Sequence, residues 1–189
     1  MITFIKKQKK EPIIAFCGSA NTKNEHLYEH YLQQLNADTK ILADISGQQL
    51  QNVLTGSAKP YFIKPNIHEF GDLLGVKQGV FSYLDHSLLK DVPFILVSCG
   101  REGAVAKFHE RLFDIQIPKI ETINPTGSGD ATVGGIAFAL DQGLSIEETL
   151  KYGMACGMSN ALEQAVGYVT KENVARLKNK IVLHEIQRN

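Results

Sequence analysis

The chain has 189 residues, of which 43% are hydrophobic and 21% charged, a composition typical of a globular protein with a sizeable core. Its 20 basic and 20 acidic residues give a formal net charge of zero, which argues against a nucleic-acid partner and favours a small molecule or a protein. No apolar run approaches the ~20 residues that span a bilayer, so we also expect no membrane partner.

The three cysteines lie too far apart to form a recognisable motif. Cys17, Cys99 and Cys156 include no Cys-x-x-Cys pair and no Cys/His cluster of the kind that binds zinc. Each is flanked by small or apolar residues, so we expect buried, reduced thiols in a cytoplasmic protein. The histidines show no motif, and we expect His68 to be an exposed helix residue. A short apolar piece precedes the first lysines, the reverse of a secretory signal, which predicts a solvated tail with Lys6, Lys7, Lys9 and Lys10.

The first half of the chain alternates short apolar runs with segments of helical periodicity. Strands are predicted at residues 12–16, 40–45, 60–64 and 94–98, the first of them a buried parallel strand. Helices are predicted from Asn21 or Thr22 to about residue 36, and at 48–54, 66–74 and 82–90. Gly75 would end the third of these helices.

The second half begins with two alternating segments, residues 104–108 and 112–117, that predict an antiparallel hairpin. A glycine-rich turn then opens a helix. Ser145 with Glu148 forms a capping box for another helix through residue 162, and Thr170 would cap a last helix that ends near His184. Strands that alternate with helices indicate an α/β protein with a parallel sheet.

Polar groups gather where the predicted strands end. In open parallel sheets, ligands bind at the carboxyl ends of the strands, so these groups are expected to face one crevice. They are Ser19, Asp44, Lys64 with Asn66, Ser98 with Gly100, and the glycine turn.

The glycine turn is the strongest candidate site. Residues 124–135 read NPTGSGDATVGG and pass into an apolar segment, so the turn opens a helix whose first N–H groups lack intrahelical partners. Gly127 and Gly129 would let an anion approach the backbone at the positive end of the helix dipole. Asp130 is the carboxylate beside this hole and could accept the proton of an attacking hydroxyl. The alternative is a plain helix cap with glycines for tight packing. The turn is neither a Walker A loop nor a G-x-G-x-x-G motif.

A second signal is Lys64-Pro65-Asn66-Ile67-His68-Glu69. Its structural interpretation is a capping box, with Asn66 as N-cap and Glu69 three residues later. Its functional interpretation is that this amide and carboxylate hold a hydrated Mg²⁺ beside nucleotide phosphates. Both interpretations can hold at once.

The glycine turn resembles the C-terminal signature of the ribokinase-like PfkB carbohydrate kinases. The resemblance implies an anion hole formed by Gly127, Ser128 and Gly129, with Asp130 as the catalytic base. The Asn66–Glu69 pair resembles the family's N-x-x-E motif for Mg²⁺ and phosphate. Residues 97–104 are similar to its nucleotide loop, and residues 157–163 to the helix beside the adenine. The resemblance therefore implies ATP as cofactor, bound through Lys64, Asn66, Ser98, Gly100, Gly103 and Asn160.

The resemblance covers about residues 12–169 and is strongest to tagatose-6-phosphate kinases and their 1-phosphofructokinase relatives. It implies a ribokinase-like three-layer α/β/α fold with a mostly parallel sheet. The family's Gly-Gly sugar-binding motif, its N-terminal strands and its lid are not recognisable here. We therefore expect residues 1–189 to form a single, C-terminal nucleotide-binding part of a ribokinase-like domain.

The leading functional hypothesis is ATP- and Mg²⁺-dependent phosphorylation of a sugar phosphate, either tagatose 6-phosphate or a fructose phosphate. The alternative is a truncated, catalytically impaired fragment that binds nucleotide without transferring phosphate. A nucleotide-regulated interaction module is a third option. A sheet cut in its middle exposes a strand edge, so we also expect a homo-oligomer.

Overall fold

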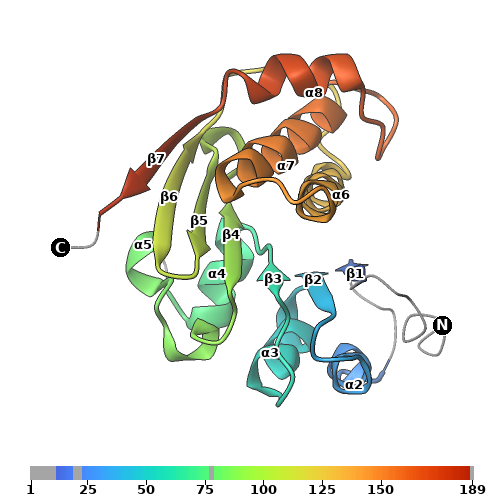
Figure 1. The fold of residues 1–189 in the computed structure, drawn as a ribbon, viewed down its shortest axis with the longest axis vertical. Helices are drawn as coiled ribbons and strands as arrows, with labels where there is room; N and C mark the ends of the chain where they lie inside the picture. Colours follow the sequence, from blue (N-terminus) through green and yellow to red (C-terminus); the bar gives the residue numbers. More distant parts are fainter. Residues whose placement is uncertain (1–11, 19–22, 77–78, 188–189) are drawn as a thin grey trace. The chain divides into compact units, whose positions relative to one another are not determined.

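The computed structural model of the chain (Figure 1) describes residues 12–18, 23–76 and 79–187. It divides the chain into two units, Met1–Ser98 and Cys99–Asn189. The expectation of a single domain stays a prediction. Within the described ranges, no helix is long and apolar enough to cross a membrane. Several sequence predictions fall outside the described residues, namely those for Lys6, Lys7, Lys9, Lys10, Ser19, Asn21 and Thr22.

The first unit is built on four strands that pair in sequence order. They are β1 (Ile13–Cys17), β2 (Lys40–Asp44), β3 (Phe62–Ile63) and β4 (Phe94–Ser98). All three neighbouring pairs are parallel. The predicted parallel sheet is therefore confirmed in this unit. Four apolar residues of β4 are fully buried, as expected for a strand covered on both faces.

The first strand differs from its prediction, because it is only partly buried. Among the described strands of this unit, β1 pairs along one side only, with β2. Ala15 and Cys17, which share one face of the strand, are exposed. The prediction of three buried thiols is therefore wrong for Cys17, whereas Cys156 is buried and Cys99 is half-buried.

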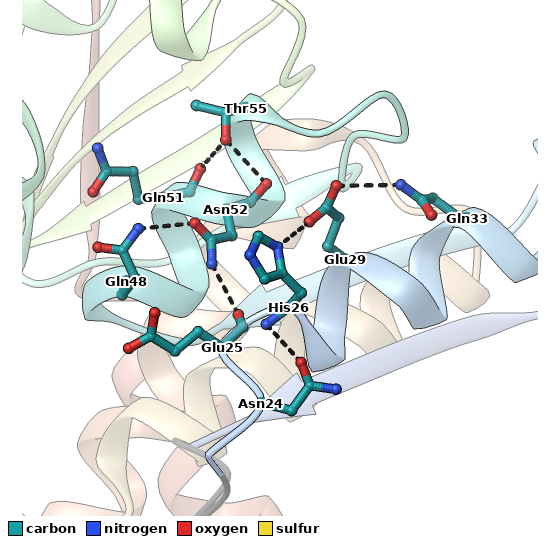
Figure 2. Close-up of polar contacts among 9 residues, drawn as sticks. All are labelled: Asn24, Glu25, His26, Glu29, Gln33, Gln48, Gln51, Asn52 and Thr55. Carbon is teal, nitrogen blue, oxygen red and sulfur yellow. Dashed lines mark hydrogen bonds and ion pairs between the residues drawn. The ribbon is translucent and has the colours of Figure 1, made fainter.

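The helices of the first unit are α2 (Leu27–Gln34), α3 (Gly47–Thr55), α4 (Ile67–Leu74) and the short α5 (Val80–Tyr83). Helix α2 begins later than predicted. The Asn24 side chain accepts a hydrogen bond from the N–H of His26 (3.1 Å), which holds the preceding residues in a turn instead of a helix. Figure 2 shows how Asn52 of α3 is tied to that turn by donating to the Glu25 carbonyl (3.1 Å).

The helix predicted at residues 82–90 is wrong. The chain instead forms α5 and then a 3₁₀ turn, η1 (Ser87–Leu89). His86 separates them with an extended backbone (φ −57°, ψ 140°), and its ring accepts a hydrogen bond from the Leu88 N–H at 3.2 Å. A side chain that caps a new turn in this way interrupts the longer helix.

The second unit has three antiparallel strands. The predicted hairpin is confirmed as β5 (Ala104–Phe108) and β6 (Arg111–Gln116), preceded by a 3₁₀ turn, η2 (Gly100–Glu102). Strand β7 (Val182–Ile186) pairs with β6 and replaces the end of the predicted last helix. That helix, α8, stops at Lys178. The Arg111 guanidinium of β6 binds both carboxylate oxygens of Glu185 in β7 (2.8 and 2.7 Å).

Helices α6 (Ser128–Asp141), α7 (Ile146–Ala161) and α8 (Lys171–Lys178) pack in succession in the second unit. Three glycines permit the close approach of α6 and α7. A Cβ on Gly135 would lie 2.8 Å from the Cys156 sulfur, and one on Gly153 or Gly157 would overlap side chains of α6. The helix pair therefore depends on the absence of these side chains.

Candidate active site

The glycine turn leads directly into α6, as predicted. Gly127 is the N-cap residue and lies in the left-handed region (φ 82°, ψ 0°). The first intrahelical bond runs from the Ala131 N–H to the Gly127 carbonyl (2.9 Å), so the N–H groups before it have no partner inside the helix. Ser128 donates its N–H to the Pro125 carbonyl (3.1 Å). Of the predicted anion hole of Gly127, Ser128 and Gly129, the Ser128 N–H is therefore already engaged within the turn. Among the described residues, the N–H groups of Gly127, Gly129 and Asp130 have no hydrogen-bond partner.

No residue other than glycine fits at position 127. Its positive φ strains any L side chain, and a Cβ would lie 2.6 Å from Val166 Cγ1 and 3.2 Å from the Gly167 nitrogen. Close packing against residues 166–167 thus fixes where the helix can start.

Asp130 lies in the first turn of α6 and is exposed. Within the described part of the chain, its carboxylate has no hydrogen bond or ion pair with another side chain. A carboxylate at this end of a helix is favoured by the dipole. The start of α6 thus places backbone N–H donors near an exposed carboxylate. The anion hole at Gly127, Ser128 and Gly129 and the role of Asp130 as base stay predictions.

Asn160, predicted to lie near the adenine, is fully buried in α7. Its Nδ2 donates to the Thr126 carbonyl (2.9 Å) and to Ser128 Oγ (3.1 Å), while its Oδ1 accepts from the Gly167 N–H (2.6 Å). All three partners belong to the protein, so the amide contacts the glycine turn itself. Only the family resemblance pointed to Asn160, and it implied a different role, beside the adenine.

Asn124 is a second residue whose role the sequence did not reveal. Its side chain accepts from the Thr126 N–H (3.0 Å) and donates to the Gln164 carbonyl (3.0 Å). It therefore holds the entry to the turn against the loop after α7. Asparagine directly before a proline in a glycine-rich turn is the feature that could have indicated it.

The first unit holds the capping box at the start of α4. Asn66 Oδ1 accepts from the N–H groups of His68 (2.9 Å) and Glu69 (3.0 Å), and Glu69 Oε2 accepts from the Asn66 N–H (2.8 Å). The structural interpretation of this motif is confirmed, as is the exposed position of His68. Glu69 Oε1 takes no part in the box. No group of three or more His, Cys, Asp or Glu residues in the described ranges is arranged to hold a metal.

Lys64 is buried at the end of β3 and is paired with Asp44 at the end of β2. The Nζ–Oδ1 distance is 3.2 Å, and the two side chains are 7% and 17% exposed. A buried ammonium group needs such a partner. The pairing assigns to Asp44 a role that the sequence left open, namely to hold Lys64 at the carboxyl ends of the parallel strands.

Ser98 is half-buried and forms a parallel bridge with Asn66, since its N–H donates to the Pro65 carbonyl (3.0 Å). Ser98 thus lies at the same end of the first unit's strands as Lys64. The next residue, Cys99, has its pKa raised by burial and further by the nearby acidic groups of Asp114 and Glu102.

Gly100 and Gly103 belong to the second unit and flank the 3₁₀ turn before β5. Both have a positive φ, 60° and 94° respectively. A Cβ on Gly103 would overlap the Ile115 carbonyl of β6. Gly103 therefore has a structural reason to be glycine, the closure of the hairpin, whether or not a nucleotide approaches it.

The structure thus gathers most of the predicted site residues in two places, while Gly100 and Gly103 lie at the turn before β5. In the first unit, one end of the parallel strands carries Asp44, Lys64, Asn66, Glu69 and Ser98. In the second unit, the start of α6 carries Gly127, Ser128, Gly129 and Asp130, with Asn160 buried beneath them.

Together with the strand order, these features define an α/β protein of the ribokinase-like class. A putative phosphofructokinase from Staphylococcus aureus has the same fold, with a TM-score of 0.85, 25% identity, and 100% of this chain matched to 62% of that one. Phosphofructokinase-2 from Escherichia coli, solved with potassium, matches with a TM-score of 0.81 at 18% identity, over 94% of this chain and 59% of that one.

The pfkB family carbohydrate kinases match residues 5–172, and the chain belongs to this family. Tagatose-6-phosphate kinases from two strains of Staphylococcus epidermidis are each 38% identical in an alignment of 150 residues that covers 77% of this chain and 48% of theirs. The chain thus spans about half the length of these curated relatives. The family resemblance seen in the sequence is confirmed.

Proposed function

We propose that this chain supplies the nucleotide- and phosphoryl-binding part of an ATP-dependent sugar-phosphate kinase. The observation that carries the proposal is the start of α6, where a left-handed Gly127 precedes backbone N–H groups without partners inside the helix, next to the exposed Asp130. Membership of the PfkB family supports it.

In the proposed reaction, an acceptor hydroxyl forms a bond to the γ-phosphorus of ATP, and the bond from that phosphorus to the β–γ bridging oxygen breaks. Asp130 takes the hydroxyl proton, and ADP leaves with the bridging oxygen. The N–H groups of Gly127 and Gly129 in the predicted anion hole, together with that of Asp130, stabilise the negative charge of the transferred group. Such transfers depend mainly on positioning and charge stabilisation, which fits a turn held rigidly by its neighbours.

The residues at the start of α4 offer one carboxylate oxygen that could bind magnesium. Magnesium prefers one or two carboxylates together with water and phosphate oxygens, and bound there it would neutralise phosphate charge. Glu69 offers Oε1 for this purpose. The Asn66 side-chain oxygen already accepts two N–H groups, so Asn66 orients Glu69 and is not itself a ligand. Lys64, held by Asp44, would add positive charge for the nucleotide phosphates.

We propose a sugar phosphate as the acceptor, tagatose 6-phosphate or a fructose phosphate. The names of the relatives support this choice, since they include tagatose-6-phosphate kinases and a phosphofructokinase solved with fructose 6-phosphate. The alternative is a catalytically impaired chain that binds nucleotide only. It is favoured by the fact that the matched residues are about half of each curated relative.

The test compares Asp130→Asn with the intact chain. ADP release is measured with Mg-ATP and each candidate sugar phosphate, and binding of a non-hydrolysable ATP analogue is measured separately. We expect the variant to lose turnover by at least about a hundredfold while it retains analogue binding. Asp141→Asn, at the other end of the same helix, is the control and should change neither quantity.

Three outcomes are informative. Loss of analogue binding in Asp130→Asn would contradict the role of base. Analogue binding without turnover in the intact chain would favour the impaired alternative. No binding at all would refute the proposal.

A cytoplasmic location and the lack of a nucleic-acid partner stay predictions. We also propose self-association, which is supported by a relative solved as a tetramer.

A further inference from the structure

We propose that Asn160 is a positioning residue that holds the anion-binding turn in shape by joining residues 126–128 to Gly167. In this role it acts on the nucleotide only through the backbone of the turn. The inference rests on the proposed function, since it takes the turn to be the phosphoryl site. It changes the expected role of Asn160 from contact with adenine to support of the site.

The hydrogen bonds of the Asn160 amide define its orientation. The Gly167 N–H can only donate, so the atom that meets it is Oδ1; the Thr126 carbonyl can only accept, so the atom that meets it is Nδ2. Ser128 Oγ accepts the other Nδ2 hydrogen. With the side chain fully buried, no solvent replaces a lost partner. An unpaired group here would be costly, so the amide and the turn hold each other in place.

The packing of α6 on α7 brings Asn160 to this position. Gly157 lies one turn before Asn160 on α7, and a Cβ there would overlap Thr132 and come within 2.9 Å of the Ser128 carbonyl. The missing side chain lets α7 pass directly under the first turn of α6. The Asn160 side chain can then reach the backbone of residues 126–128.

The same amide also controls what covers Gly127. The loop that carries Val166 and Gly167 closes over Gly127, and the Gly167 N–H bond to Asn160 (2.6 Å) fixes that loop. The Asn160 side chain therefore holds both the backbone of residues 126–128 and the loop that packs on Gly127. If the bond is lost, the loop can move and Gly127 is no longer held in its left-handed conformation.

The experiment uses Asn160→Asp, which has the same shape but removes both N–H donors and places an oxygen opposite the Thr126 carbonyl. The matched control is Asn52→Asp. Asn52 is also a buried amide that donates to a backbone carbonyl, that of Glu25, and it lies in the other unit (Figure 2). Asn160→Ser is a milder second variant for the case in which the aspartate does not fold.

Two quantities are measured on the full chain, with folding checked by circular dichroism. The first is amide hydrogen exchange of residues 126–130 and 167, which needs no ligand. The second is affinity for Mg-AMP-PNP. We expect Asn160→Asp to raise exchange in these residues at least tenfold and to weaken binding at least tenfold. Asn52→Asp should change neither, even if its melting temperature falls by a similar amount.

Unchanged exchange at the turn in Asn160→Asp, or in Asn160→Ser if the aspartate variant is unfolded, would overturn the inference. So would an equal loss of binding in the Asn52→Asp control, because the effect would then be general destabilisation. If the intact chain fails to bind Mg-AMP-PNP, the proposed function is refuted, and the exchange data alone decide whether Asn160 shapes the turn.

Discussion

Glu69 has a structural role in the capping box of α4, and we propose a second role for it as a magnesium ligand. One of its carboxylate oxygens closes the capping box of α4, while the other takes no part in it. The structural need is met equally well by a glutamine, because the capping box accepts Glu or Gln at this position. A glutamine would not replace the glutamate as a magnesium ligand, because a neutral amide is a poor ligand for Mg²⁺. The two roles can therefore be separated.

We predict that Glu69→Gln changes the free energy of unfolding by less than about 0.5 kcal/mol but weakens Mg-nucleotide binding by on the order of tenfold or more. Asn66→Ala is the contrasting variant and should lose about 1 kcal/mol of stability, since two N–H groups lose their acceptor. Urea denaturation and calorimetric titration measure the two effects. Unchanged Mg-nucleotide affinity in Glu69→Gln would contradict the role of Glu69 as a magnesium ligand, and only its role in the capping box would remain.

The cysteines differ from one another in exposure and acidity. Burial raises the pKa of Cys156 to about 11, so its thiol is protonated at neutral pH and becomes reactive only as the pH approaches that value. Cys17 is exposed in the partly buried β1.

We predict that iodoacetamide at pH 8 labels Cys17 at least about a hundredfold faster than Cys156 in the folded chain, because the Cys156 thiol is buried and stays protonated at that pH whereas Cys17 is exposed. Peptide mass spectrometry measures the rates, and the urea-unfolded chain is the control in which the difference should vanish. Labelling of the two thiols at similar rates in the folded chain would contradict the burial of Cys156.

The candidate site at the start of α6 depends on the close packing of α6 against α7. Gly157 has no room for a side chain, since a Cβ would meet Thr132 and the Ser128 carbonyl. Gly134 of α6 is the opposite case: it is exposed, and a Cβ there would meet nothing within 4 Å. Gly134 and Gly157 can therefore be compared by the same substitution, one with room for a side chain and one without.

We predict that Gly157→Ala lowers the free energy of unfolding by ~1–3 kcal/mol through overpacking, whereas Gly134→Ala raises it by ~0.5–1 kcal/mol through reduced backbone entropy. Because the chain has no tryptophan, denaturation is followed by circular dichroism. A neutral Gly157→Ala would mean that the helices can separate without cost.

The elements that sequence patterns predicted correctly are those with strong local signals. The capping box began α4 at the expected residue, and Gly75 ended it in the left-handed conformation (φ 68°). Strand β7 was missed because residues 182–186 follow a helix without a strong stop signal. Their extended conformation is stabilised by pairing with β6 and by the Arg111–Glu185 contact, which joins residues far apart in sequence.

At the scale of the whole molecule, the partly exposed strand β1 is a candidate site for self-association of the chain. Its residues include half-buried Ile13, Ile14 and Phe16, and among the described strands it pairs only with β2. A partly apolar strand edge of this kind is a template for pairing with another chain.

We predict that the chain self-associates at micromolar concentration and that Ala15→Lys weakens the association about tenfold or more by placing a charge on the exposed strand. Light scattering after size exclusion measures the mass over a concentration series. Gln33→Lys, on the exposed surface of α2, is the control and should leave the mass unchanged. A monomer at every concentration would rule out the prediction.

The sequence by itself determined the parallel strands, the glycine turn at the start of a helix, the capping box and the family, because each is encoded by residues close together in the chain. The tertiary structure alone decided that Cys17 is exposed, that residues 182–186 form a strand, and that the Asn160 amide serves the turn 32 and 34 residues before it. The physical reason is the same in each case. Burial and the hydrogen bonds of a buried side chain depend on which distant segments fold against it.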